Sequence, residues 1–230
     1  MSALRVPQTL EIGVIVMKRR DFLKTAALAV GGGLLTSARA QPAATRVCLH
    51  AFSKPLQWLG YDALAETLAQ SGCGGIDLSV RPKGHVEPDK VEENLPRAVE
   101  AARKQGLKID MIVTAITAAD EPLAERTLKT AAQCGIKVYR MGYFKYDNTL
   151  GVEGSIEKNH KQMAALESLN KKCGITGCYQ NHAAWGEGLF GGPVWDIYYM
   201  LRGLDPQWVG CQYDIRHAVA ESGGSWSVAM

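Results

Sequence analysis

The residues best suited to chemistry lie near the end of the chain, where Asp214 and His217 stand three apart directly after an apolar run. A second polar group, Gln180-Asn181-His182, follows an earlier apolar run. Carboxylate and amide oxygens suit hard cations such as Mg²⁺ or Mn²⁺, and Co or Zn becomes suitable when histidines join them. The two segments therefore predict a polar site with a divalent metal.

Six apolar runs, each preceded by a turn and followed by a helical pattern, are the elements that must position these residues. Their starts lie about thirty to forty residues apart, the length of one βα unit. Strands that are apolar on both faces and alternate with helices predict a parallel sheet covered by helices. The expected strands are 47–52, 75–80, 109–114, 137–142, 176–181 and 209–214.

The helical patterns between the runs have recognisable faces and ends. Apolar residues at Leu95, Ala98, Val99 and Ala102 follow the i, i+3, i+4, i+7 spacing of an amphipathic helix. Val194, Ile197, Tyr198 and Leu201 repeat that spacing. The expected helix ends are Gly72, Gly106, Gly135, Gly174 and Asp205-Pro206.

An open doubly wound sheet and a (β/α)8 TIM barrel both fit this alternation. No Gly-x-Gly-x-x-Gly follows the first run, whose exit reads Phe52-Ser53-Lys54-Pro55, so a dinucleotide crevice is unsupported. Polar residues at the carboxyl ends of the runs favour the α/β barrel, where active sites collect at that end. Six strands instead of eight predict a barrel that is C-terminally incomplete within residues 41–230.

Most runs are followed by polar candidates that a barrel would direct to one mouth. Asp77 could instead cap a turn, Arg81 and Arg140 could be surface ion-pair partners, and Asn181-His182 could bond its own loop. His160, on a polar helix face, is expected to face solvent. The full set is Ser53, Lys54, Asp77, Arg81, His85, Thr114, Arg140, Gln180, Asn181, His182, Asp214 and His217.

Four segments together resemble the xylose isomerase-like TIM-barrel family of sugar phosphate isomerases and epimerases, over residues 46–226. They are Gly-Ile-Asp-Leu-Ser-Val-Arg-Pro at 75–82, Tyr-Arg-Met-Gly at 139–142, Tyr-Gln-Asn-His at 179–182 and Asp-Ile-Arg-His at 214–217. The resemblance implies a divalent metal held after strands five to eight. It places Asp214 at the sixth-strand ligand and Gln180 at the fifth-strand Glu.

The resemblance also implies substrate contacts and a chemistry. His217 matches a substrate-contacting residue, and Asn181-His182 match the polar pair after the fifth-strand ligand. Lys54, Arg81, His85 and Arg140 would suit an acidic or polyhydroxylated carbohydrate, so these seven residues are the expected substrate-binding set. The implied reaction is metal-assisted proton transfer next to a sugar carbonyl.

Departures from the family pattern predict impaired catalysis. An amide such as Gln180 has no proton affinity near neutrality and cannot act as the base. The last two family ligands would lie beyond Met230. The alternative is therefore a catalytically inactive periplasmic carbohydrate-binding protein, and lyase or hydrolase chemistry on sugars remains open. The related apurinic endonucleases need a richer metal cluster and a basic face.

The first forty residues predict an export signal rather than part of the barrel. A basic stretch at 18–24, eleven mildly apolar residues at 25–35 and Ala38-Arg39-Ala40 form a signal peptide with cleavage near Ala40. The adjacent Arg19-Arg20 resemble the twin-arginine address. Eleven residues are too few to span a bilayer, so a periplasmic or otherwise exported protein with no stable membrane anchor is expected. Translation could start at Met1 or Met17.

Removing that signal also removes the apparent basicity of the chain. Residues 1–40 contribute +4, from six basic and two acidic side chains, so the formal +3 of the whole chain becomes −1 for residues 41–230. No basic stripe remains to bind a nucleic acid. The six cysteines lie in or beside apolar runs without C-x-x-C spacing, and we expect them to be reduced.

Overall fold

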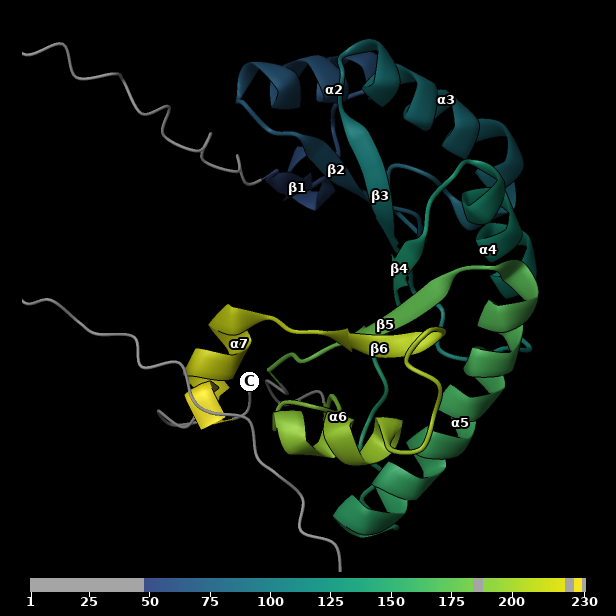
Figure 1. The fold of residues 1–230 in the computed structure, drawn as a ribbon, viewed down its shortest axis with the longest axis vertical. Coiled ribbons are helices and arrows are strands. Elements are labelled where there is room, and N and C mark those ends of the chain that lie inside the picture. Colours follow the sequence, from purple (N-terminus) through teal and green to yellow (C-terminus); the bar gives the residue numbers. More distant parts are fainter. Residues whose placement is uncertain (1–47, 184–187, 222–225, 229–230) are drawn as a thin grey trace, which may run out of the picture. The chain divides into compact units, whose positions relative to one another are not determined.

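A computed structural model describes residues 48–183, 188–221 and 226–228. Six parallel strands form one sheet in the sequential order β1-β2-β3-β4-β5-β6, as Figure 1 shows. Every strand lies within or one residue beside a predicted run, so the predicted α/β class and the six strands are confirmed. The strands are β1 His50–Phe52, β2 Gly75–Ser79, β3 Lys108–Val113, β4 Val138–Arg140, β5 Thr176–Gln180 and β6 Val209–Gln212.

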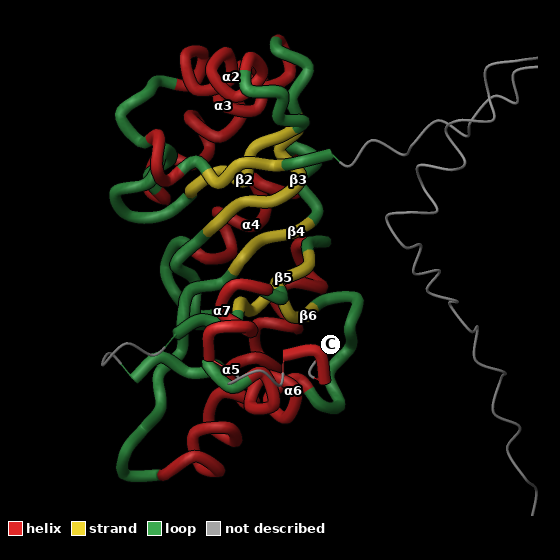
Figure 2. Tube along the Cα trace, turned by 90° about the vertical axis from the view of Figure 1, so that its left-hand side faces the viewer, coloured by secondary structure: helices red, strands yellow, loops and turns green. Residues whose placement is uncertain are grey.

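The helices that follow the strands cover one face of this sheet. Helices α2 to α5 succeed one another along that face in both Figure 1 and Figure 2. The helices are α2 Tyr61–Gln70, α3 Val91–Lys104, α4 Ala124–Gln133, α5 Gly151–Cys173, α6 Val194–Leu201 and α7 Ile215–Glu221, with short 3-10 turns η1 Lys54–Leu56, η2 Pro88–Lys90 and η3 Trp226–Val228. None of the described helices has the length and apolarity to cross a membrane.

Helix ends mostly follow the predicted glycines. Helix α5 stops at Gly174, whose φ of 71° is the left-handed conformation that glycine adopts without a steric penalty. Helix α6 differs, because it ends at Leu201, before the predicted Asp205-Pro206. Gly203, with a φ of 87°, turns the chain between these two points.

The helix-facing side of the sheet is fixed by large buried side chains and one buried amide. Tyr139 of β4 is fully buried and donates its hydroxyl to Asn170 Oδ1 of α5 at 2.9 Å. Asn170 Nδ2 in turn donates to the Trp208 carbonyl at 2.8 Å, just before β6. This amide therefore joins β4, α5 and the start of β6.

The opposite face of the sheet carries the candidate site. Successive strand residues alternate between faces, so Arg140 and Gln180 point away from the helix-packed Tyr139 and Tyr179. Arg140 pairs in register with Cys178, two residues before Gln180. The register thus brings the polar ends of β4 and β5 together.

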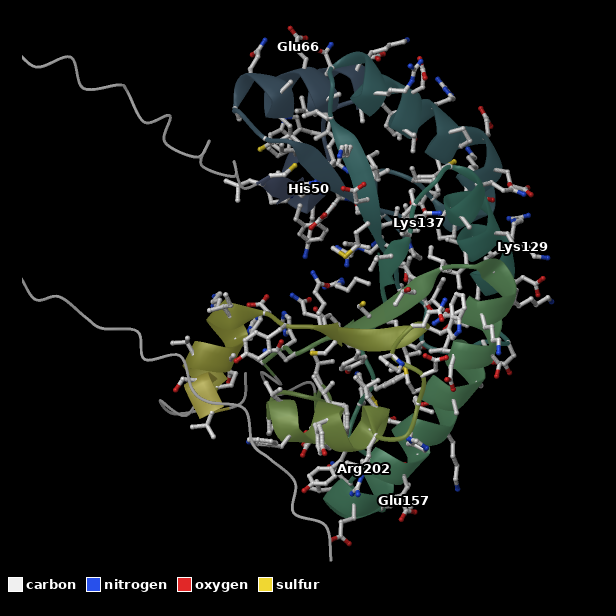
Figure 3. The ribbon with its side chains drawn as sticks, viewed as in Figure 1. His50, Glu66, Lys129, Lys137, Glu157 and Arg202 are labelled. Carbon is white, nitrogen blue, oxygen red and sulfur yellow. The ribbon has the colours of Figure 1, made fainter. Side chains whose placement is uncertain are left out.

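The periphery holds exposed charges and one corrected prediction. Glu66 of α2 and Lys129 of α4 point outward, away from the sheet, in Figure 3. The prediction that His160 faces solvent is wrong. Its half-buried ring places Nδ1 2.7 Å from the Met200 carbonyl and links α5 to α6. All six cysteines are free thiols.

Gly177 in β5 tests how tightly the helix-facing layer is packed. A Cβ there would meet Asn170 Nδ2 at 2.7 Å and Tyr139 Cε1 at 2.8 Å, whereas at Gly210 in β6 it would meet only Cys178 Sγ at 3.7 Å. We expect Gly177→Ala to lower the free energy of unfolding by about 1–3 kcal/mol relative to Gly210→Ala, measured by urea denaturation. Equal midpoints for the two variants would contradict this packing.

Candidate functional site

A continuous hydrogen-bond chain joins the carboxyl ends of β4, β5 and β6. Arg140 Nη1 donates to Gln180 Oε1 and to the Tyr143 hydroxyl, each at 2.6 Å. The Tyr143 hydroxyl donates to the same Gln180 oxygen at 2.6 Å. Gln180 Nε2 then donates to Asp214 Oδ2 at 2.7 Å. The amide thus couples the guanidinium to the carboxylate without direct contact between them.

Asp214 is held in place from both sides. Asn181 is fully buried, accepts from the Asp214 backbone N–H at 2.6 Å and donates to the Asp214 carbonyl at 3.0 Å. The carboxylate Oδ1 accepts the His217 backbone N–H at 3.1 Å and so caps the start of α7. Because both amide atoms of Asn181 are used on the backbone, its role here is to position Asp214. Its predicted substrate contact stays a prediction.

Two imidazole rings lie against each other beside the carboxylate, tilted by 40°. The His182 and His217 ring centroids lie 4.0 Å apart, and His182 lies 4.9 Å from the Tyr143 ring. His182 Nδ1 faces the Ala183 carbonyl at 3.0 Å, so this nitrogen carries the proton. His217 Nδ1 faces two donors, the Ala183 N–H at 3.4 Å and Arg216 Nη1 at 3.2 Å, which favours the neutral ring.

Burial lowers the pKa of His217 below its ordinary value, and nearby His182 lowers it further. Asp214 and Glu221 oppose this shift. The ring is buried, and His217 Nδ1 is 4.0 Å from Glu221 Oε1. His217 is therefore expected to remain neutral at neutral pH, acting as a packed wall of the site.

Two guanidinium groups share one aromatic ring at the other side of the site. The Arg81 and Arg140 Cζ atoms lie 5.8 and 6.0 Å from the Phe52 ring centroid. Arg140 also lies 5.0 Å from the Tyr143 ring. Burial lowers the pKa of Arg140. Within the described part of the chain neither arginine has a carboxylate partner within 4 Å, so the surface ion-pair alternative is wrong for both.

The remaining candidates near β1 and β2 form a mostly structural cluster. Ser53 and Ser79 are buried, with hydroxyl oxygens 3.2 Å apart, and Ser79 Oγ lies 3.2 Å from His85 Nδ1. Burial lowers the pKa of His85, and its Nε2 is enclosed without a partner among the described residues. Lys54 is exposed at the start of η1.

Two other candidates lie away from the hydrogen-bond chain. Asp77 lies within β2 and faces His50 at 3.6 Å, so it does not cap a turn. Burial raises the pKa of Asp77, although His50 opposes the shift. Thr114 is buried and donates to the Arg140 carbonyl at 2.9 Å, so it supports the end of β4.

Tyr143 and Phe52 are the site residues that sequence reasoning missed. Tyr143 follows β4 by three residues and Phe52 ends β1, so an aromatic residue at or just after a strand end was the available signal. Burial raises the pKa of Tyr143, although Arg140 opposes the shift, so the phenol stays protonated and donates. Both aromatic rings lie beside the guanidinium of Arg140, and Tyr143 also packs against the hydrophobic core.

The described residues do not fit the predicted divalent metal. They contain no group of three or more His, Cys, Asp or Glu side chains placed to hold a cation. Gln180 Oε1, the predicted amide ligand, already accepts two hydrogen bonds, one of them from a cation. Asp214 is the single carboxylate of the hydrogen-bond chain. The metal therefore remains an expectation from resemblance.

Sequence and structure comparisons place this architecture in a family. The profile described as Xylose isomerase-like TIM barrel matches residues 65–229. The chain therefore belongs to the xylose isomerase-like TIM barrel family, and the predicted resemblance is confirmed. No curated protein matches the chain.

Several solved structures share the fold. A candidate xylose isomerase from Rhodospirillum rubrum is 16% identical with a TM-score of 0.60, covering 76% of this chain and 68% of that one. A D-tagatose 3-epimerase-like protein is 14% identical with a TM-score of 0.58, covering 79% and 69%. A Methylomonas sp. D-allulose 3-epimerase, solved with D-allulose, is 12% identical with a TM-score of 0.53, covering 76% and 65%. At these identities the likeness shows the fold alone.

The environment of His217 predicts a titration below the ordinary histidine pKa of about 6.5. The unfolded chain then binds the extra proton, so the contribution of His217 to folding stability is complete above about pH 6.5 and is lost as the pH falls through the folded pKa. We expect NMR titration of the His217 Cε1–H signal to give a lower midpoint in the folded protein than in urea. Equal midpoints would contradict the enclosed, neutral ring.

Proposed function

We propose that the protein is a sugar isomerase or epimerase-like protein that binds a small carbohydrate at the carboxyl ends of β4, β5 and β6. The observation that carries this proposal is the chain from Arg140 and Tyr143 through Gln180 to Asp214. It combines fixed donors with one carboxylate acceptor, which suits the alternating donor and acceptor hydroxyls of a sugar. The sugar epimerases among the solved structures of this fold support the same class.

Among the described members of the hydrogen-bond chain, Asp214 is the one whose side chain can take a proton from carbon. Gln180 cannot, because an amide lacks proton affinity, and it acts by orienting the carboxylate. The proton next to the sugar carbonyl would pass to Asp214. Its return to the neighbouring carbon, with a proton moving between the two sugar oxygens, would give the isomer, whereas epimerisation requires that water or another donor protonate the original carbon from the opposite face. Arg140 supplies donors for the oxygen on which negative charge develops, through the Nη2 hydrogens that Gln180 and Tyr143 do not use. The same proton removal could also begin elimination of a β-substituent, the lyase alternative.

A second candidate function is sugar binding without turnover. It is favoured by Gln180 at the position of the family's Glu and by the occupancy of both Asp214 oxygens. Oδ2 accepts Gln180 Nε2 and Oδ1 accepts the His217 N–H. Each carboxylate oxygen of Asp214 thus already accepts one hydrogen bond. Turnover separates this candidate from the first.

Proton exchange in D₂O tests the proposal. With ketoses and aldoses as substrates, we expect NMR to detect solvent deuterium at the carbon next to the carbonyl. Asp214→Asn should slow this exchange by about 10²–10⁴-fold because it removes the base, while asparagine still caps α7. Asp89→Asn, an exposed carboxylate change in η2, should leave the rate unchanged.

The outcomes separate the two candidates. Calorimetric sugar binding without deuterium incorporation in the wild-type protein would favour the inactive binding protein. No binding of any sugar would contradict both candidates. Exchange that persists in Asp214→Asn would exclude Asp214 as the base.

We also propose that the protein is exported by the twin-arginine translocation machinery. Residues 1–40, on which this rests, lie outside the described residues, and the support is the basic stretch 18–24 followed by a short apolar segment. A periplasmic location would give the site access to carbohydrates outside the cytoplasm.

Fractionation of a bacterial host with a twin-arginine translocase tests export. We expect the full chain in the periplasmic fraction in a shortened form cleaved near Ala40. Arg19→Lys combined with Arg20→Lys should hold it in the cytoplasm, because that receptor reads the arginine pair. Lys24→Arg serves as the matched basic control. Equal export of the double variant would contradict the twin-arginine route.

A further inference from the structure

We propose that Arg81 and Arg140 form an anion pocket, so that the carbohydrate bound at this site carries a carboxylate or phosphate group. This inference rests on the proposed function, since it names the substrate class of the same site. Both groups are oxyanions, a planar one in the carboxylate and a tetrahedral one in the phosphate, and either would be attached to a polyhydroxylated carbon chain. A neutral sugar would leave this pocket unfilled.

The first observation is the placement of two like charges at one ring. The Arg81 and Arg140 Cζ atoms lie 5.8 and 6.0 Å from the Phe52 ring centroid. The positive charge of Arg81 repels that of Arg140 and so contributes to lowering the pKa of Arg140. The ring face attracts both cations but cannot neutralise them. An anion placed between the two guanidinium groups would remove the repulsion.

The second observation is the incomplete pairing of Arg140. Arg140 is 7% exposed, yet the only hydrogen bonds that its side chain makes to described residues come from Nη1 and reach the neutral acceptors Tyr143 and Gln180. Its Nε is enclosed without any acceptor among them. A buried charge without a counter-ion is costly, and an enclosed donor adds to that cost. A ligand oxyanion would supply the missing negative charge.

The third observation is that the nearby carboxylate does not contact Arg140, although its charge partly opposes the lowering of the Arg140 pKa. Asp214 is separated from Arg140 by the Gln180 amide, which accepts from the guanidinium and donates to the carboxylate. Gln180 therefore keeps the two charges apart. This spacing leaves the positive end of the hydrogen-bond chain for a ligand anion and the negative end for hydroxyl donors.

Guanidinium groups suit this role better than ammonium groups would. A planar fork such as that of Arg81 pairs two parallel N–H donors with the two oxygens of a carboxylate or of a phosphate, and Arg140 adds the Nη2 donors that Tyr143 and Gln180 do not use. Arg81 is half-buried and Arg140 is nearly enclosed, so water competes less for the donors than at an open surface. The pocket is thus built for one anionic group at one end of a sugar.

Calorimetry on the full chain tests this with a matched set of ligands: a hexose, the corresponding hexuronate, the hexose 6-phosphate and inorganic phosphate alone. We expect the uronate or the sugar phosphate to bind at least about tenfold more tightly than the hexose, equivalent to ~1.4 kcal/mol. Whichever binds more tightly identifies the source of the anion. The preference should shrink between about 0.01 and 1 M salt, because the arginines are partly accessible.

Variants assign the preference to the two arginines. Arg81→Gln should abolish the preference for the anionic sugar, and Arg140→Lys should weaken it, because lysine keeps the charge but loses the planar array of donors. Lys129→Gln makes the same charge change on the outer side of α4 (Figure 3) and should preserve it.

Each outcome bears on one claim. Equal affinities for neutral and anionic sugars, or a preference retained in Arg81→Gln, would overturn the anion pocket and leave the proposed carbohydrate function standing. Binding of inorganic phosphate alone, without any sugar ligand, would support the pocket and overturn the carbohydrate function. If a variant fails to fold, the salt dependence of the wild-type preference decides, and a preference that does not change with salt overturns the pocket.

Discussion

Burial of the Arg140 guanidinium constrains the whole carboxyl end of the sheet. A positive charge at the end of a central strand must be solvated by protein groups, and here two neutral oxygens and two aromatic rings do so. Gln180 is fixed by that requirement, because its oxygen must face the arginine. Its amide nitrogen then has to face Asp214. The orientation of each side chain in this hydrogen-bond chain thus fixes the orientation of the next side chain.

Strand pairing in the sheet aligns the polar residues at the carboxyl ends of neighbouring strands. In-register pairing places Arg140 beside Cys178 and Gln180 beside Gln212, so the polar residues of β4, β5 and the loop after β6 reach the same edge. Asn181 then clamps the Asp214 backbone with two hydrogen bonds. The barrel scaffold needs few side chains to make this arrangement rigid. A change in the type of one residue, such as Gln180, would therefore alter the hydrogen bonds at this edge without altering the sheet.

The sequence predicted those features of the fold that depend on the residue types of the segment itself. Apolar runs predicted all six strands, because buried strands require apolar residues. Glycines predicted most helix ends, because left-handed turns favour glycine. The end of α6 was predicted too late, because the chain already turns at Gly203, before Asp205-Pro206. The prediction for His160 was wrong because its partner is a backbone carbonyl of α6. Every residue has a backbone carbonyl, so residue types do not reveal such a partner.

The candidate site could be predicted only in part, for the same reason. Strand-end positions pointed to Arg140, Gln180 and Asp214, but the hydrogen bonds among them depend on side-chain directions across strands. Tyr143 and Phe52 were missed because aromatic residues near a strand end are more often core residues than partners of a cation. The resemblance predicted a metal from ligand positions, whereas the structure shows an arginine bonded to the predicted amide ligand.

The central claim is that Arg140, rather than a metal ion, is the cation at the Gln180 oxygen and that it faces the ligand. A crystal structure grown with Mn²⁺ and a hexuronate, with anomalous diffraction data, tests it most directly. The account predicts the uronate carboxylate between Arg81 and Arg140 and no anomalous peak at Gln180 Oε1. A Mn²⁺ peak bridging Gln180 and Asp214, with the Arg140 guanidinium displaced, would contradict it.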